Sequence, residues 1–502
     1  MALGGKFLGS IFGKKAPEEY FDQGLAEYDQ GNFEKAIENY SAALELQPRY
    51  ADAYFNRALA YFGLGNFELA IADLTRAVEI NPFMSAELFY NRGLAYFYLG
   101  NFGQAIEDYT KTIEMEPRFL QAYDGRGLCF SNKQEFDKAI PDYDQALKLD
   151  PDYPNGYYNR GLAYANKGDL DRAIADLSKA IDLNFSELDQ AYYNRGRAYD
   201  LKGDHDLAIA DATKMIELHP EVAEYYQNRG ISYAKKNDPD RAISDFSQAL
   251  KLSPGLAVSH YNRGLAYKNK GELAKAVKDF DEALERKFPD QGSVLFSRAG
   301  AYHQKGDLAR AIGDYSKAIE IDPQDAESRY QRGMVFCDQG GFEKAVSDFS
   351  RVIEISGADS EGAYLNRGLA YYYQNNFEKA VLDFNRAIEI NPDWALPYNC
   401  RGLIFAQQND FERAILDFTR ALELDPGYLK AYQNRGSAYF CKNDFDRAIA
   451  DYDKALAIDA SEAFVYHGRG LAWFNKGDLV MAKADYERAV ELDPRFAKQP
   501  YK

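Results

Sequence analysis

The sequence predicts an all-α solenoid of fourteen tandem helix-turn-helix repeats, and three observations support that fold class. A pattern recurs every 34 residues, or every 35 in four of the repeats. Within each repeat, position 20 is always alanine, and position 8 is glycine in twelve repeats and alanine in two. Position 15 is glycine or asparagine in thirteen repeats, and both types tolerate the positive φ that ends a helix. The repeats begin at residues 17, 51, 86, 120, 154, 189, 223, 257, 292, 326, 361, 395, 429 and 463.

The two helices of each repeat are expected to pack as an antiparallel hairpin. Position 11, in the first helix, is Tyr, Phe or Trp in thirteen repeats, and position 24, in the second, is aromatic or leucine in thirteen. Large side chains from each helix can therefore meet the small residues of the other. Position 16 is mostly aspartate or asparagine, which predicts an N-cap for the second helix.

This pattern closely resembles the tetratricopeptide repeat family, whose unit also has proline at position 32. Ten repeats have that proline, and the resemblance covers residues 17–496. Recurring sequence motifs such as NRG and AIADY are similar to those of bacterial members. The resemblance implies a right-handed superhelix whose concave groove is lined by positions 2, 5, 6, 9, 12 and 13 of the first helices. The prolines are Pro48, Pro82, Pro117, Pro151, Pro220, Pro254, Pro323, Pro392, Pro426 and Pro494.

The segments outside the array are short. Residues 1–16 form a leader that is expected to be disordered, to cap the first repeat, or to touch a membrane weakly through residues 6–15, which mix apolar and lysine side chains. Position 21 is Ile or Val in thirteen repeats but Lys483 in the last, so the array is expected to end there, followed by a tail at 497–502.

Composition and motifs argue against several function classes. A net charge of −18 disfavours nucleic-acid binding, because phosphates need a basic face. The four cysteines lie far apart without metal-ligand spacing, the five histidines are scattered, and no run of apolar residues reaches membrane-spanning length. We therefore expect a cytoplasmic protein with no catalytic site, metal or cofactor.

The most regular polar feature joins position 7 to position 23. Arginine at 7 and aspartate at 23 occur together in thirteen repeats, such as Arg160 with Asp176, and the first repeat lacks both. This joint occurrence favours an ion pair between the two helices or with the neighbouring repeat. The alternative is a pair between the aspartate and a basic residue three positions on, but three repeats have glutamine or glutamate there.

Candidate ligand-binding residues are the asparagines of position 6 and the aromatic residues of position 5. A carboxamide both donates and accepts, so a row of them can satisfy the backbone of an extended peptide, and the pattern is similar to the asparagine ladder in the repeats of O-linked N-acetylglucosamine transferases. The alternatives are contacts between neighbouring repeats for the asparagines and packing on the adjacent helix for the rings. The candidates are Asn56, Asn91, Asn159, Asn194, Asn228, Asn262, Asn366, Asn434, Tyr158, Tyr193, Tyr261, Phe296 and Tyr330.

The function that these patterns favour is a non-enzymatic scaffold or adaptor that binds extended segments of other proteins in the groove. Chaperone C-termini are disfavoured as partners, because position 9 is never asparagine. Two alternatives remain open: a structural or self-assembling protein, and a non-catalytic regulatory subunit of an enzyme complex.

Overall fold

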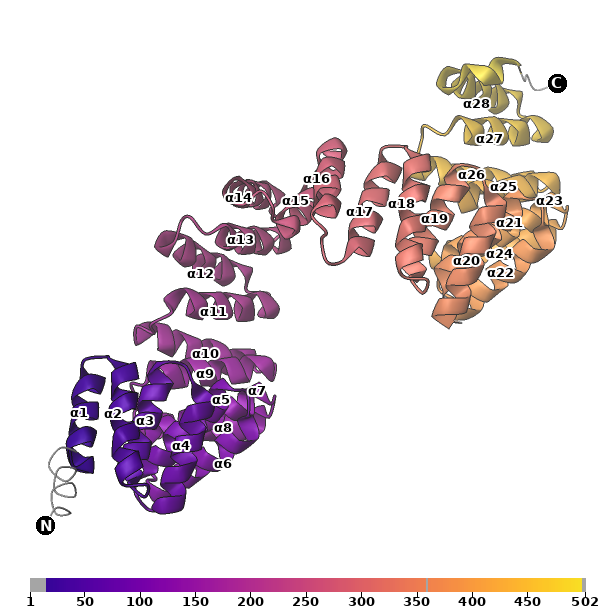
Figure 1. Ribbon diagram of the computed structural model, residues 1–502. Helices are drawn as coiled ribbons and strands as arrows, with labels where there is room; N and C mark the ends of the chain where they lie inside the picture. The colour runs from indigo at the N-terminus through magenta and orange to yellow at the C-terminus, as the bar shows by residue number, and fades with distance from the viewer. Residues whose placement is uncertain (1–14, 358–359, 499–502) are drawn as a thin grey trace, which may run out of the picture. The chain divides into compact units, whose positions relative to one another are not determined.

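The computed structural model describes residues 15–357 and 360–498, so most of the leader and the end of the tail lie outside the described residues. The described residues form twenty-eight α-helices and a short 3-10 helix, with no strand among them, which confirms the all-α class. Consecutive helices pack as antiparallel pairs, one pair for each predicted repeat (Figure 1). The chain divides into two compact halves, residues 1–254 and 255–502, each with seven repeats.

Odd-numbered helices are the first helices of the repeats and even-numbered helices are the second. The helices of the N-terminal half are α1 (Pro17–Asp29), α2 (Phe33–Leu46), α3 (Ala51–Gly63), α4 (Phe67–Ile80), α5 (Ala86–Tyr98), α6 (Phe102–Met115), α7 (Leu120–Asn132), α8 (Phe136–Leu149), α9 (Pro154–Asn166), α10 (Leu170–Asp182), α11 (Leu188–Lys202), α12 (His205–Leu218), α13 (Ala223–Lys235) and α14 (Pro239–Leu252).

The C-terminal half repeats the same arrangement and ends in the 3-10 helix. Its helices are α15 (Ala257–Asn269), α16 (Leu273–Glu285), α17 (Gln291–Gln304), α18 (Leu308–Ile321), α19 (Ala326–Asp338), α20 (Phe342–Ser356), α21 (Glu361–Tyr373), α22 (Phe377–Ile390), α23 (Ala395–Gln407), α24 (Phe411–Leu424), α25 (Leu429–Cys441), α26 (Phe445–Ile458), α27 (Ala463–Lys476), α28 (Leu479–Leu492) and η2 (Pro494–Lys498).

The turn between the two helices of a repeat has the predicted backbone. Position 15 has a positive φ in all fourteen repeats, including Gln134 at 61°, where the sequence has neither glycine nor asparagine. The next residue is the N-cap of the second helix in every repeat. In seven repeats its side chain accepts a hydrogen bond from the backbone N–H three residues on, as Asp307 does from Arg310.

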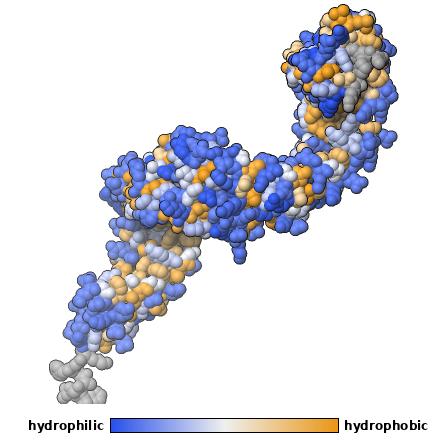
Figure 2. Space-filling view, turned by 90° about the horizontal axis from the view of Figure 1, so that it is seen from above, coloured by the Kyte–Doolittle hydropathy of each residue, from blue (hydrophilic) through white to orange (hydrophobic). Residues whose placement is uncertain are grey.

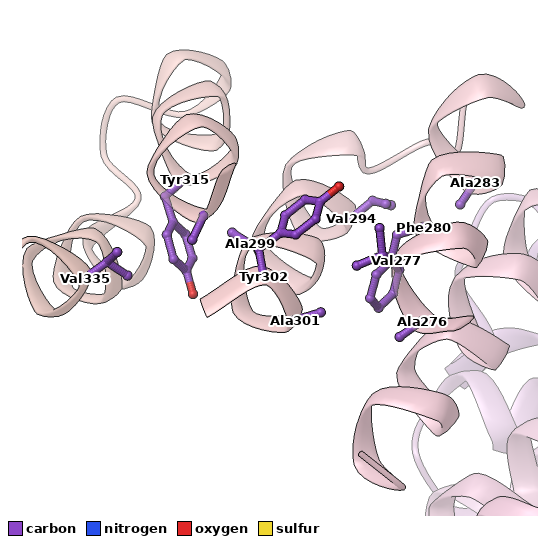
Figure 3. Packing of buried hydrophobic residues seen from close by; sticks show 11 residues of the cluster. Ala276, Val277, Phe280, Ala283, Val294, Ala299, Ala301, Tyr302, Tyr315 and Val335 are labelled. Atoms are coloured by element: carbon purple, nitrogen blue, oxygen red, sulfur yellow. The ribbon is translucent and has the colours of Figure 1, made fainter. Parts of the chain in front are cut away.

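All repeats except repeat 6 pair a large residue at position 24 with a small one at position 8. A Cβ added at Gly127, position 8 of repeat 4, would lie 2.6 Å from the ring of Tyr143, position 24 of the same repeat. In Figure 3, Tyr315 lies between Ala299 of its own repeat and Val335 of the next. The same ring therefore also packs against the neighbouring repeat. Burial of this kind stabilises by about 1.5–3 kcal/mol for each large apolar side chain.

Two repeats that lack proline at position 32 end their second helices early. In repeats 5 and 8 the residue at position 31 has a positive φ, Asn184 at 55° and Lys287 at 54°. Phenylalanine follows in place of proline, and its ring lies against a position 5 tyrosine: Phe185 stacks on Tyr158 with centroids 4.3 Å apart. In repeats 5 and 8 the extra residue is thus accommodated in a left-handed turn.

The predicted Arg–Asp pair is present in all thirteen repeats that have these residues. In repeat 10, Nε and Nη2 of Arg332 donate to Oδ2 and Oδ1 of Asp348, at 2.8 and 2.6 Å. Nη1 donates to Ser316 Oγ in the preceding repeat, at 2.9 Å. The ion pair of Arg332 is therefore the one between the two helices of its own repeat, and its bond to the neighbouring repeat goes to a hydroxyl. The same three-helix contact recurs within each half, as Arg57 and Arg435 illustrate.

The face seen in Figure 2 is mainly hydrophilic. On the face seen in Figure 2, apolar residues form small groups between hydrophilic ones. Within the described residues, no helix has the length and apolar character needed to cross a bilayer.

Candidate functional site

Three hollows follow one another along the first helices of the N-terminal half. The first, of about 630 Å³, lies between α7, α8 and α9, and the second, of about 660 Å³, is lined by α9, α11 and α13. The third, of about 210 Å³, lies between α11, α12 and α13. Leu162 borders the first two, and Tyr193 and Asn228 border the last two. We call this row of hollows the groove.

The middle hollow brings together four of the candidate residues. Tyr158 comes from α9, Tyr193 and Asn194 from α11, and Asn228 from α13. They meet because positions 5 and 6 lie on one face of each first helix, and stacking of the repeats places these faces side by side. Asn159 lines the first hollow. Asn262 lies in the C-terminal half, together with Tyr261, Phe296, Tyr330, Asn366 and Asn434.

Some position 6 asparagines donate to the position 5 side chain of the preceding repeat. Asn159 Nδ2 lies 2.9 Å from Asp124 Oδ1, and Asn194 Nδ2 lies 3.1 Å from the Tyr158 hydroxyl. In the C-terminal half, Asn366 donates in the same way to the Tyr330 hydroxyl at 2.7 Å, and Asn434 to Asn399 Oδ1 at 2.9 Å. Contacts of this kind, between neighbouring repeats, are the alternative to a peptide-binding asparagine ladder that was considered from the sequence.

Three further asparagines donate to the backbone of their own helix. Nδ2 of Asn56, Asn91 and Asn262 lies 2.8, 2.8 and 2.9 Å from the carbonyl oxygen four residues earlier. In all seven cases the donor of the amide is used, whereas the side-chain carbonyl oxygen accepts from no group in the described part of the chain. Asn228 differs, because its amide makes no side-chain hydrogen bond to any described residue while it borders two hollows.

The candidate rings are mostly packed between helices. Phe296 contacts Tyr315 with centroids 5.6 Å apart, Tyr330 contacts Phe349 at 5.6 Å, and Tyr261 contacts Phe288 at 4.7 Å. Tyr158, stacked on Phe185, is half-buried. Tyr193 is the most open of the five, at 38% exposed, and it borders two hollows.

Charge differs from one hollow to the next. Glu224 and Asp189 border the middle hollow, and Asp189 accepts a hydrogen bond from the Tyr225 hydroxyl at 2.7 Å. Arg197, Lys235 and Asp200 border the third, so its lining carries two cations and one carboxylate. The groove is therefore acidic at its middle hollow and slightly basic at its third, in a chain of net charge −18.

A buried carboxylate lies next to the groove at Asp124. Burial raises its pKa, and the hydrogen bonds donated by Asn159 and by the Tyr153 hydroxyl, at 2.9 Å each, partly offset that rise. Because three residues from neighbouring repeats share these bonds, the network fixes the position of the Asn159 amide in the first hollow.

The described residues contain no group of three or more His, Cys, Asp or Glu side chains that could hold a metal ion. The four cysteines are unpaired. Burial raises the pKa of the Cys129 and Cys400 thiols to about 12 and that of Cys337 to about 11, so these three are protonated at neutral pH.

The third hollow was not predicted from the sequence, although a signal was present. Ala212 is the single residue at position 24 that is neither aromatic nor leucine, and it lines the third hollow together with Gly196, the small residue of position 8. A Cβ added at Gly196 would lie 3.5 Å from its nearest neighbour, in contrast to the close approach at Gly127. Two small residues where other repeats pair a large with a small one leave space in the structure.

Comparison with protein-family models accounts for most of the chain. Models of the tetratricopeptide repeat match residues 21–85, 86–119, 154–186, 189–221, 223–256, 261–326, 362–393, 395–428, 429–461 and 463–496, and a model of the TPR repeat matches residues 127–168. The chain belongs to the tetratricopeptide repeat family. The family and the solenoid fold predicted from the 34-residue period are thereby confirmed.

Several solved structures resemble parts of this one. The MamA protein is 28% identical, covering 34% of this chain and 93% of its own, with a TM-score of 0.33. YrrB, described as a TPR protein with an unusual peptide-binding site, is 29% identical, covering 37% of this chain and 95% of its own, with a TM-score of 0.34. The C-terminal part of a repeat protein from Cytophaga hutchinsonii is 21% identical, covering 48% and 97%, with a TM-score of 0.42. No curated protein matches the sequence.

Proposed function

We propose that this tetratricopeptide repeat protein is a non-enzymatic scaffold that binds extended segments of other proteins in the groove along α7, α9, α11 and α13. The observation that carries this proposal is the middle hollow, which gathers Tyr158, Tyr193, Asn194 and Asn228 from three consecutive first helices. An opening of about 660 Å³ has room for several residues of a peptide but lacks the enclosure of a small-molecule site.

The asparagines suit the backbone of such a segment. Asn194 uses its donor within the protein, so its carbonyl oxygen is left to accept from a peptide N–H. Asn228 has both its donor and its acceptor available, and so can bond a peptide C=O as well as an N–H. Tyr193, with its exposed ring, supplies apolar contact between the two amides. Glu224 favours a basic residue of the partner over the middle hollow.

We place this function in the cytoplasm. The support is the set of four unpaired cysteines in a chain of 502 residues, which suits a reducing compartment. The regulatory subunit of an enzyme complex would use the same groove and differ only in the partner that it holds.

Changing Asn194 and Asn228 together to alanine is expected to weaken peptide binding by at least about tenfold, because each amide contributes roughly 1 kcal/mol through its hydrogen bonds. The measurement begins with selection of binders to the full chain from a library of unstructured peptides. Fluorescence anisotropy then gives the Kd of the selected peptides for the wild-type chain and for the variant.

The matched control is the double change of Asn56 and Asn91 to alanine. These two residues occupy position 6 in the same half of the chain, but they border none of the three hollows, and their amides bond their own helix. Binding that survives in N194A/N228A, or that falls equally in N56A/N91A, contradicts the proposed groove. Circular dichroism melts establish that all three proteins are equally folded.

A further inference from the structure

The third hollow of the groove exists because repeat 6 lacks the large side chain that closes this place in other repeats. Position 24 is Ala212, and it lines the hollow together with Gly196. In repeat 7 the same pair is Phe246 and Gly230, and a Cβ on that glycine would lie 2.8 Å from the phenylalanine ring. The space in repeat 6 is thus where another repeat holds a ring of its own.

Met215 fills only part of this space. It occupies position 27, which is alanine in most repeats, and it is 2% exposed. A cavity of about 210 Å³ remains beside it, floored by Ala208, Ala212 and Met215. An apolar cavity of about 150 Å³ already accommodates benzene, and an unbranched methionine side chain adapts readily to a guest. The cavity therefore has the size and lining for an aromatic ring.

The rim of the cavity carries a cation that the protein leaves without a carboxylate. Arg197 occupies position 9, where most repeats have leucine, and it is exposed. Its guanidinium carbon lies 5.7 Å from the Tyr193 ring centroid. In the described part of the chain no aspartate or glutamate forms an ion pair with it. An anionic group on the guest would supply that partner.

The other charged groups at the cavity are already paired. Asp200, which is 13% exposed, accepts hydrogen bonds at 3.0 Å from Ser232 Oγ and at 3.1 Å from Lys235 Nζ, and its Oδ1 lies 2.9 Å from His205 Nδ1. This network closes one wall, so it does not call for a cationic guest. The charge that lacks a counterpart at the rim is the positive charge of Arg197.

We propose that this cavity, bounded by Gly196, Ala212 and Met215 with Arg197 at its rim, is an anchor pocket for an aromatic side chain of a bound segment that has a carboxylate next to it. The proposal rests on the proposed function, because the pocket shares Tyr193 and Asn228 with the middle hollow. A partner segment then places a phenylalanine in the space that Phe246 fills in repeat 7, and an adjacent acidic residue at Arg197.

The test uses 3-phenylpropanoate, which carries a ring and a carboxylate, with the full chain labelled with ¹³C at the methionine methyl groups. The chain has six methionines, and the variant Met215→Leu identifies the signal of Met215. We expect a saturable shift of that signal with 3-phenylpropanoate and none with propanoate. The uncharged 3-phenylpropanol is expected to bind on the order of tenfold more weakly, because it lacks the charge-assisted bond.

Two variants locate the guest. The filled variant, Ala212→Phe with Met215→Ala, has at positions 24 and 27 the same residues as Phe246 and Ala249 of repeat 7, so it should fold. Ligand-detected saturation transfer should then find no binding of 3-phenylpropanoate to it. Arg197→Leu gives position 9 the leucine that most repeats have there. It should reduce the affinity for 3-phenylpropanoate to that for 3-phenylpropanol. Arg172→Leu, on the exposed side of α10, is the charge control and should change neither affinity.

The proposal is overturned if 3-phenylpropanoate leaves the Met215 signal unchanged, or if it binds the filled variant as it binds the wild-type chain. It is also overturned if the selected peptides bind the filled variant as tightly as the wild-type chain but no longer bind N194A/N228A. That result would leave the proposed groove intact. If instead no peptide binds the groove but 3-phenylpropanoate shifts Met215, the pocket stands as a ligand site and the proposed function fails.

Discussion

Replacing Arg332 with methionine is expected to lower the free energy of unfolding of repeats 9 and 10 by about 3–5 kcal/mol. Arg332 bonds Asp348 through two parallel N–H groups and Ser316 through a third. Asp348 is 4% exposed, so removal of the arginine leaves a carboxylate in the interior without a cation. The cost arises mainly from that unpaired charge, since a buried pair contributes little net free energy when both partners are present.

The measurement is urea unfolding combined with hydrogen exchange of the backbone amides in α18, α19 and α20. The exchange data are needed because a repeat array can lose a few repeats before the rest. The control is Arg351→Met, which breaks the exposed pair between Arg351 and Glu354 and should cost less than about 1 kcal/mol. Equal costs for the two variants would mean that the Arg–Asp pair is not a link between repeats. Changing Arg332 and Asp348 together to methionine should recover much of the loss.

Replacing Phe418 with alanine is expected to cost about 3–5 kcal/mol of local stability. Phe418 is fully buried at position 24 of repeat 12 and packs on Gly402, whose added Cβ would lie 2.7 Å from the ring. The substitution recreates in repeat 12 the pairing of alanine and glycine found at Ala212 and Gly196. We therefore expect a cavity there as well, and benzene should restore part of the lost stability.

Thermal melts and hydrogen exchange in α23 and α24, with and without benzene, measure both effects. Phe83→Ala is the control, because Phe83 is 83% exposed and its ring contributes little to the core. A loss at Phe418 no larger than that at Phe83 would contradict the role assigned to position 24.

Much of the fold follows from sequence because each repeat meets the same steric demands. Position 20 is alanine, and position 15 adopts a positive φ, in all fourteen repeats, so copies of the same local constraints reinforce one another. Gln134 is neither glycine nor asparagine, yet its backbone has the same positive φ as position 15 of the other repeats. The packing of α7 on α8 imposes this left-handed conformation. The early ends of α10 and α16 were not predicted, because they depend on Phe185 and Phe288 finding a tyrosine to pack on.

The site was harder to predict because a helix face does not reveal what a side chain bonds. Asn194 and Asn228 occupy the same position in adjacent repeats, yet the first donates to Tyr158 and the second has no such partner among the described residues. The difference lies in position 5 of the preceding repeat, which is a tightly packed ring at Tyr158 and an open one at Tyr193. The third hollow depends on Ala212, a single departure from the pattern at position 24.

Photo-crosslinking from position 193 tests most directly whether partner segments bind in the groove. The full chain would carry p-benzoylphenylalanine in place of Tyr193, which faces the groove, or in place of Leu207, which is 48% exposed on α12, the second helix of the same repeat. With a peptide selected for binding, we expect a crosslink from position 193 and none from position 207. A crosslink from position 207 alone would contradict binding in the groove and would indicate that the second helices form the binding surface.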